Sequence, residues 1–176
     1  MYKPIIPALA VLGKKASGKT TAVEIIVKAL TGRQLNVMTI KHVSQEGFTL
    51  DKGGTDTWRH WKAGARIVSA ISDSEKAIMI KDGEHIELSM LDCWAGKVDA
   101  IVFEGFSSLL LGEENVGKVI CLKEWSEKET YLSSIRGTLV ALCSLNLEGH
   151  GILKLGLDDG ILAERATQFL SATSAE

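Results

Sequence analysis

The sequence predicts an α/β fold in which a mostly parallel β-sheet is flanked by helices. Two observations support this prediction. Short apolar segments of strand length alternate along the 176 residues with segments whose apolar residues recur every three or four positions, as in amphipathic helices. Near the start, the apolar residues 5–12 lead through a glycine-containing turn into a helical pattern over residues 20–30. This order of strand, turn and helix is that of a βα unit, the building block of a parallel sheet.

In the first half of the chain, the next segments predict a strand, a long loop and a short helix. Thr31 and Gly32 are typical of a helix end, and residues 35–41 form the second apolar segment of strand length. Residues 42–55 are polar and contain several glycines, which predicts a loop. Residues 56–62 then predict a short helix. Two further strands are predicted at residues 66–71 and 76–80.

In the second half, the apolar segments predict buried strands. Residues 98–103 are strongly apolar, which suits the centre of a parallel sheet, and residues 119–122 and 139–143 are similar. Residues 107–117 form an insertion rich in Leu and Gly, which we expect to be a mobile loop or part of a subunit contact. Helices are predicted at residues 88–94, 125–134 and 158–170, the last of which begins in a run of acids.

Length and composition suit one globular domain over residues 1–176. The formal net charge of −2 gives no basic field that would attract nucleic acid or an anionic membrane. No apolar run reaches the roughly 20 residues that a membrane span needs, and the N-terminus lacks a signal-peptide pattern. Cys93, Cys121 and Cys143 form no C-x-x-C pair, which predicts free thiols and a cytoplasmic protein.

The most informative segment is Gly13–Thr20, which matches G-x-x-x-x-G-K-[ST], the phosphate-binding P-loop. Glycines let the backbone turn tightly, so that successive N–H groups converge on phosphate oxygens. Lys19 is expected to reach the β- and γ-phosphates, and the Thr20 hydroxyl is expected to bind Mg²⁺. The fold class is therefore P-loop NTPase-like, with a nucleoside triphosphate as ligand. The alternative is a plain βα turn that contains Gly-Lys-Thr by chance.

Two further segments place polar residues where parallel strands end. In an open α/β sheet, ligands bind outside the carboxyl ends of the strands. Lys41 and His42 lie at the carboxyl end of the second predicted strand, so they are expected at the phosphate-binding edge, although an ordinary surface lysine and loop histidine are an equal alternative. Glu104 follows the apolar strand at residues 98–103, as does the acid that holds Mg²⁺ beside many P-loops. Gly105 would let the backbone approach the nucleotide.

A third segment, residues 51–65, contains carboxylates in a glycine-bearing loop. Asp51 and Asp56 suit Mg²⁺ held through water, but Asp56 or Thr55 would equally serve as the N-cap of the following helix. Trp58 and Trp61 are three residues apart, which places them on one helix face and favours packing over ligand stacking. Arg59 is expected to pair with a phosphate or with a neighbouring carboxylate.

Taken together, these segments resemble the molybdopterin-guanine dinucleotide biosynthesis protein B (MobB) family over about residues 5–171. The resemblance lies in Gly18-Lys19-Thr20-Thr21, Ile40-Lys41-His42, residues 51–65 and Glu104-Gly105-Phe106, in this order. It implies a P-loop protein that binds GTP with Mg²⁺ and hydrolyses GTP slowly. It also implies a homodimer that assists a MobA-like nucleotidyltransferase in attaching GMP to molybdopterin.

The predicted site combines the motif with what the resemblance implies. Lys19 and Glu104 are the candidate catalytic residues, and Thr20, Asp56 and Glu104 are the candidate metal ligands. The nucleotide-binding candidates are Gly13, Lys14, Ser17, Gly18, Lys19, Thr20, Thr21, Lys41 and His42. Lys14 also occupies the place where some dimeric P-loop ATPases hold a lysine that reaches the partner's nucleotide; the alternative for it is a solvated charge.

The chain departs from the family pattern and leaves other functions open. Ser107 stands where the family often has Lys, which removes one expected cation. The chain also lacks Asn-Lys-x-Asp, the motif by which many GTPases recognise guanine. The choice of GTP over ATP therefore rests on the resemblance. An adaptor with no essential hydrolysis is the first alternative. A small-molecule P-loop kinase is the second, although the scattered arginines do not form a lid segment.

Overall fold

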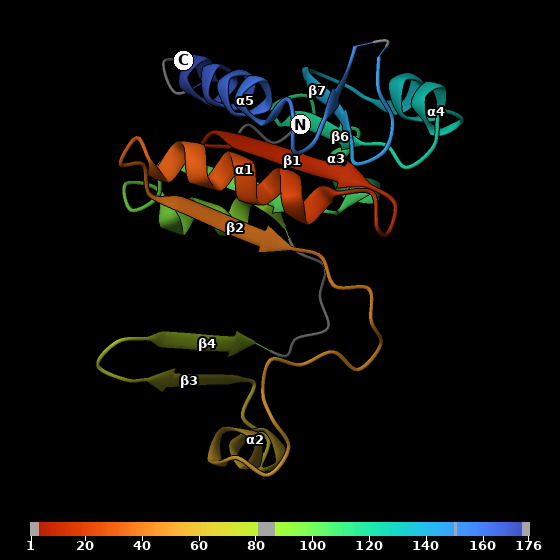
Figure 1. Ribbon diagram of the computed structural model, residues 1–176. Coiled ribbons are helices and arrows are strands. Elements are labelled where there is room, and N and C mark those ends of the chain that lie inside the picture. The colour runs from red at the N-terminus through yellow and green to blue at the C-terminus, as the bar shows by residue number, and fades with distance from the viewer. Residues whose placement is uncertain (1–3, 81–86, 150, 174–176) are drawn as a thin grey trace. The chain divides into compact units, whose positions relative to one another are not determined.

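The computed structural model describes residues 4–80, 87–149 and 151–173 (Figure 1). The chain divides into two compact units. The first combines Met1–His42 with Glu87–Glu176, and the second is Val43–Ile86. The expectation that residues 1–176 form one domain stays a prediction. No helix within the described residues is long and apolar enough to cross a membrane.

The first unit is built on a six-stranded parallel sheet with the order β2-β5-β1-β6-β7-β8. Its strands are β1 (Ala8–Gly13), β2 (Val37–Lys41), β5 (Ala100–Glu104), β6 (Gly117–Cys121), β7 (Leu139–Ser144) and β8 (Ile152–Lys154). The predicted α/β class is therefore confirmed. The strand β1, which leads into the P-loop, lies inside the sheet between β5 and β6. Strand β8 was not expected, because three residues are too few to give a pattern.

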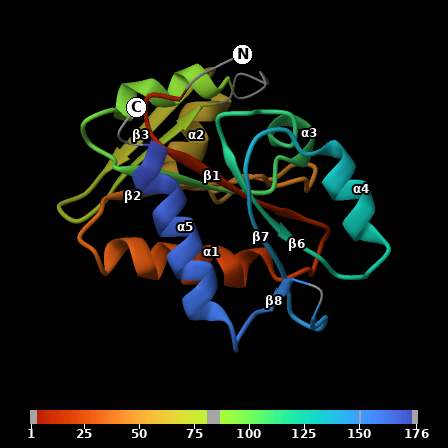
Figure 2. The same ribbon diagram turned by 90° about the horizontal axis from the view of Figure 1, so that it is seen from above.

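Helices cover both faces of this sheet (Figure 2). They are α1 (Lys19–Thr31), the 3₁₀ helix η1 (Leu88–Trp94), α3 (Ser107–Leu110), α4 (Glu127–Ser134) and α5 (Asp159–Thr173). Successive side chains of a strand point to opposite faces, so Leu9 and Val11 of β1 pack with α1 and α5. Leu12 packs in the other cluster, which includes residues of η1 and α3. Helix α1 extends one residue beyond each end of the helix predicted at residues 20–30.

The second unit contains α2 (Asp56–Lys62) and a two-stranded antiparallel sheet of β3 (Ile67–Ile71) and β4 (Lys76–Ile80). All three elements were expected, but the sequence did not show that the strands form a sheet of their own. The link from Ile71 to Lys76 is too short for a parallel crossover, which needs a dozen or more residues. The two strands therefore pair with each other.

The insertion at residues 107–117 is packed within the first unit, and its mobility or its part in a subunit contact stays a prediction. It forms α3 and the start of β6, and Leu110 is fully buried. The buried Lys118 ties its end down, because the ammonium group donates hydrogen bonds to the carbonyls of Glu113 and Arg136. Burial lowers the pKa of Lys118. A lysine inside a sheet was not expected from the sequence.

We predict that Gly117→Ala destabilises the first unit. A Cβ atom at Gly117 would lie 2.4 Å from Cε1 of the Phe169 ring on α5, so the helix or the ring must move. Overpacking of this kind costs about 1–3 kcal/mol. Urea unfolding would measure the loss. Gly112→Ala is the matched control, because a Cβ atom there meets nothing within 4 Å; equal stability of the two variants would contradict the prediction.

Candidate functional site

The turn from β1 into α1 has the backbone that the P-loop motif requires. Gly13 and Gly18 have φ angles of 150° and 96°, in the region that favours glycine. A Cβ atom on Gly13 would also lie 2.3 Å from the carbonyl oxygen of Cys121, so a side chain does not fit there. Both motif glycines are therefore needed for the shape of the turn.

Polar groups of the turn point to an anion as ligand. Helix α1 begins at Lys19, so its first N–H groups lack partners within the helix and face the turn. The Lys19 ammonium folds back over the turn and donates to the carbonyl oxygen of Lys14 at 2.6 Å. The Ser17 hydroxyl is buried and has no hydrogen-bond partner within the described residues. An orphaned buried hydroxyl is unusual, and a bound phosphate would satisfy it. Thr21 lies in the first turn of α1.

Next to the P-loop, the Glu104 carboxylate holds together residues from three elements. Its Oε1 atom accepts a hydrogen bond from the Thr20 hydroxyl at 2.9 Å and forms an ion pair with the Lys41 ammonium at 2.7 Å. The register of the parallel sheet pairs Lys41 with Glu104 directly. A threonine hydroxyl beside a carboxylate is a donor set that suits Mg²⁺. The structure thus brings Thr20, Lys41 and Glu104 together, as the sequence predicted.

His42 lies at the same edge of the sheet. Its backbone N–H donates to the carbonyl of Glu104 at 2.9 Å, and its ring centroid is 5.0 Å from that of Phe106. Gly105 has a φ of 86°, and a Cβ atom there would be 3.2 Å from Cβ of His42. Glycine therefore suits this position, because its φ angle strains other residues and a Cβ atom would crowd His42.

Lys14 has a partner that the sequence did not indicate. Its ammonium forms an ion pair with Oε1 of Glu127 at 3.1 Å, and the Glu127 side chain is only 3% exposed. Burial opposes ionisation of Glu127, but hydrogen bonds from the N–H groups of Lys123 and Glu124, together with Lys14, lower its pKa. The hydrogen bond to Glu127 in turn raises the pKa of Lys14.

Glu127 was missed because nothing in its sequence neighbourhood marks it. Glu124 and Glu127 both lie in a polar stretch that is typical of a solvated surface. Only the placement of β6 beside β1 brings the chain that follows β6 next to the P-loop. The Lys14–Glu127 pair therefore depends on the tertiary structure. A role for Lys14 in nucleotide binding stays a prediction.

The remaining predicted residues lie in the second unit. The Thr55 hydroxyl caps α2 by accepting from the N–H of Trp58 at 3.2 Å, so Thr55 rather than Asp56 is the N-cap. Asp51 Oδ1 accepts hydrogen bonds from Lys52 N, Thr55 Oγ1 and Thr57 Oγ1, which stabilises the loop before α2.

Asp56 is exposed and pairs with Arg59 at 3.3 Å. Trp61 is buried, as packing predicts, and the Lys62 ammonium lies 5.2 Å from the Trp58 ring centroid. Within the described residues, no cluster of three or more His, Cys, Asp or Glu side chains is placed to hold a metal by itself. A role of Asp56 in metal binding stays a prediction.

Comparison with known proteins identifies the family. The family model described as "Molybdopterin guanine dinucleotide synthesis protein B" (MobB) matches residues 8–144, which include the P-loop, Lys41, His42 and Glu104. The chain belongs to the MobB family. The resemblance found in the sequence is confirmed.

Curated relatives and solved structures agree with this family. The chain is 35% identical over 103 residues to a molybdopterin-guanine dinucleotide biosynthesis adapter protein of Haemophilus influenzae, which covers 57% of each chain. It is 36% identical over 118 residues to a putative adapter protein of this kind from Methanocaldococcus jannaschii, covering 66% of this chain and 47% of that protein. The chain thus spans about half the length of these two relatives.

The adapter protein of Escherichia coli K12 is 30% identical over 126 residues, and the match covers 69% of each chain. Among solved structures, Bacillus subtilis MobB has a TM-score of 0.70 at 21% identity, covering 93% of this chain and 98% of that one. A MobB homologue from Bacillus stearothermophilus has a TM-score of 0.67 at 20% identity with the same coverage. These two structures support the shared fold.

We predict that Lys14→Met raises the pKa of Glu127. The variant removes the ammonium that stabilises the ionised carboxylate, while the burial that opposes ionisation stays. In the wild type, the folded-state pKa lies below the ordinary value of 4.5. Ionised Glu127 therefore stabilises the fold above about pH 4.5, and this contribution is lost as the pH falls through the folded-state pKa. NMR titration of the carboxyl carbon would measure the shift.

Lys15→Met is the matched control, since it removes the same charge one residue away. An equal shift of the Glu127 pKa in both variants would show that positive charge anywhere nearby, and not the ion pair with Lys14, lowers the pKa of Glu127.

Proposed function

We propose that this protein binds GTP with Mg²⁺ and acts as an adapter for a MobA-like nucleotidyltransferase that attaches GMP to molybdopterin. The observation that carries the proposal is the P-loop, with the Thr20 hydroxyl held 2.9 Å from the Glu104 carboxylate at its edge. Membership of the MobB family supports the pathway, as do the names of the relatives, which are adapter proteins for molybdopterin-guanine dinucleotide biosynthesis.

In this proposal, residues of the first unit hold the triphosphate. The N–H groups of the turn and of α1, with the Ser17 hydroxyl, bind phosphate oxygens. The Lys19 ammonium leaves the carbonyl of Lys14 to contact the β- and γ-phosphates. Thr20 and Glu104 would hold Mg²⁺, which neutralises phosphate charge when bound. Lys41 keeps the Glu104 carboxylate in place through their ion pair.

Hydrolysis of GTP is expected to be slow. Attack of water on the γ-phosphate depends on positioning and on charge neutralisation, to which Lys19 contributes. Glu104 is the candidate acid, but its contacts to Thr20 and Lys41 suit it to metal binding rather than to orienting a water molecule. An adapter whose nucleotide serves binding more than turnover fits these contacts. The choice of guanine is supported by family membership alone.

We also propose that the protein is a homodimer that contacts its second copy through the hairpin of β3 and β4. The register pairs Ile67 with Ile80 and Ser69 with Ile78, which places Ile67, Ile71, Ile78 and Ile80 on one face. All four isoleucines are exposed. Exposed apolar patches of this kind mark interaction sites, and a lone two-stranded sheet is only marginally stable.

The free thiols of Cys121 and Cys143 support a reducing, cytoplasmic location.

We predict that Lys19→Ala weakens the binding of a non-hydrolysable GTP analogue by roughly 10- to 100-fold, because it removes charge-assisted hydrogen bonds to the phosphates. Calorimetric titration in Mg²⁺ would measure the dissociation constant. Lys28→Ala, at the other end of α1, is the matched control and should bind as the wild type does. Tighter binding of the ATP analogue by the wild type would overturn the guanine assignment and favour the kinase alternative.

The same variant tests whether the adapter role needs the bound nucleotide. If Lys19→Ala loses GTP yet still stimulates GMP transfer by MobA, the adaptor needs no nucleotide. If stimulation is lost with binding while Lys28→Ala keeps it, the nucleotide is required.

We predict that Ile71→Lys makes the protein monomeric, because a charge cannot be buried in an apolar interface without a partner. Light scattering after size-exclusion chromatography would report the mass. Ala70→Lys is the matched control, since Ala70 is exposed on the same strand but lies on the opposite face. A monomeric wild type would refute the dimer.

A further inference from the structure

Lys14 in the P-loop is held by protein contacts at both its backbone and its side chain. Its carbonyl oxygen accepts a hydrogen bond from the Lys19 ammonium at 2.6 Å, and its own ammonium pairs with Oε1 of Glu127 at 3.1 Å. Both ammonium groups belong to the turn that would hold phosphates. Because phosphate oxygens are strong acceptors for charged donors, a bound triphosphate competes with these protein partners for the two cations.

Glu127 is the fixed member of its ion pair with Lys14. Its side chain is 3% exposed, and its Oε2 atom accepts hydrogen bonds from the N–H groups of Lys123 and Glu124 at 2.8 and 3.4 Å. Tyr131, one turn further along α4, packs against the apolar cluster on one face of the sheet. The backbone donors and this packing therefore hold the carboxylate in place independently of Lys14.

Lys14 is the member of the pair that can move. Its side chain is 66% exposed, and a lysine ammonium sits on a flexible four-carbon stem. Strand β1 ends at Gly13, which pairs with Cys121 at the end of β6. Lys14 therefore begins the turn beside the chain that leads from β6 into α4 (Figure 2). Rotation of its stem is enough to carry the ammonium from Glu127 toward a phosphate in the turn.

We propose that Glu127 is a positioning residue that competes with a triphosphate for the Lys14 ammonium, so that the Lys14–Glu127 ion pair opens when the triphosphate binds. This inference rests on the proposed nucleotide-binding function and extends it to a residue outside the P-loop motif. The competition lowers the affinity for the triphosphate, because binding must break the ion pair. It also links the P-loop to α4, since Glu127 then keeps its backbone donors but loses its cation.

A double-mutant cycle of Lys14 and Glu127 tests this competition. Glu127→Gln has nearly the same shape and keeps an oxygen for the N–H groups of Lys123 and Glu124, but it removes the charge that holds Lys14. We expect it to tighten the binding of a non-hydrolysable GTP analogue by about fivefold. In a Lys14→Met background the same change should have no effect, because no ammonium is released. Calorimetric titration in Mg²⁺ would measure all four affinities.

Glu129→Gln is the matched control, because it removes the same charge from an exposed position on α4 and should leave the affinity unchanged. If Glu127→Gln tightens binding equally with and without Lys14, negative charge in general opposes the triphosphate, and the proposal is overturned. An unchanged affinity in Glu127→Gln would overturn it as well.

The carboxyl carbon resonance of Glu127 gives a second measurement that needs no change at this buried residue. We expect the analogue, at saturation and neutral pH, to shift this resonance in the wild type toward its position in Lys14→Met. Both conditions separate the ammonium from the carboxylate. A resonance that the bound analogue leaves in place would contradict the opening of the ion pair, even if Glu127→Gln does not fold.

The outcomes separate the inference from the function on which it rests. If the wild type binds the analogue but the cycle shows no coupling between Lys14 and Glu127, the competition is refuted while the nucleotide site stands. If the wild type does not bind the analogue, the nucleotide-binding function fails and the inference fails with it.

Discussion

The position of β5 between β1 and β2 is the arrangement on which the candidate site depends. In the parallel register, Lys41 on β2 lies beside Glu104 on β5, and β1, which leads into the P-loop, pairs with the other side of β5. The P-loop, the carboxylate and the lysine therefore meet at one edge of the sheet. Strands with their carboxyl ends aligned expose polar side chains just where the buried apolar segments stop. The single carboxylate of Glu104 can then contact both Thr20 on α1 and Lys41 on β2.

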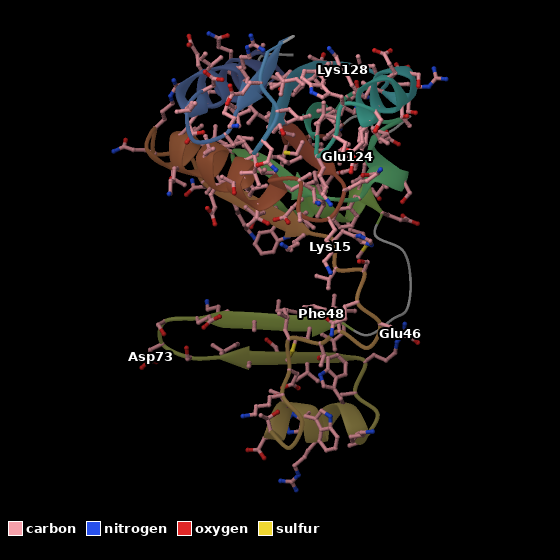
Figure 3. All side chains as sticks on the ribbon, turned by 45° about the vertical axis from the view of Figure 1, so that its right-hand side comes forward. Lys15, Glu46, Phe48, Asp73, Glu124 and Lys128 are labelled. Carbon is pink, nitrogen blue, oxygen red and sulfur yellow. The ribbon has the colours of Figure 1, made fainter. Side chains whose placement is uncertain are left out.

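Buried charged groups beside the two ends of β6 are stabilised by backbone groups as well as by side chains. Glu127 is held by two N–H groups and by Lys14, and Lys118 is held by two carbonyl groups. Buried charges are costly unless each is paired or hydrogen-bonded. These two residues therefore fix the loops around β6, and through Lys14 one of them reaches the P-loop. Figure 3 shows Lys15 of the P-loop and Glu124 of the loop after β6 in the same unit.

Much of the fold and part of the site were predictable from local patterns. The helix at Lys19–Thr31 and the strand at Lys76–Ile80 follow from periodicity and turn residues. The P-loop was predictable because its function requires a local sequence of eight residues. Glu104 was predictable because it directly follows an apolar segment, so that placing this strand in the sheet also places the carboxylate. The packing of residues 107–117 was not, because it depends on Lys118 and on a loop near Arg136.

The sequence by itself determined the P-loop, the α/β class, the MobB family resemblance and the acids and bases expected beside the phosphates. These features can be recognised from short segments of the sequence or from the order in which such segments follow one another. Only the tertiary structure decided that Glu127 pairs with Lys14, that Leu145 and Leu155 lie against Gly18, and that β3 and β4 form a sheet of their own. These contacts join segments far apart in the chain, except for the hairpin, whose strands pair because their link is too short for a crossover.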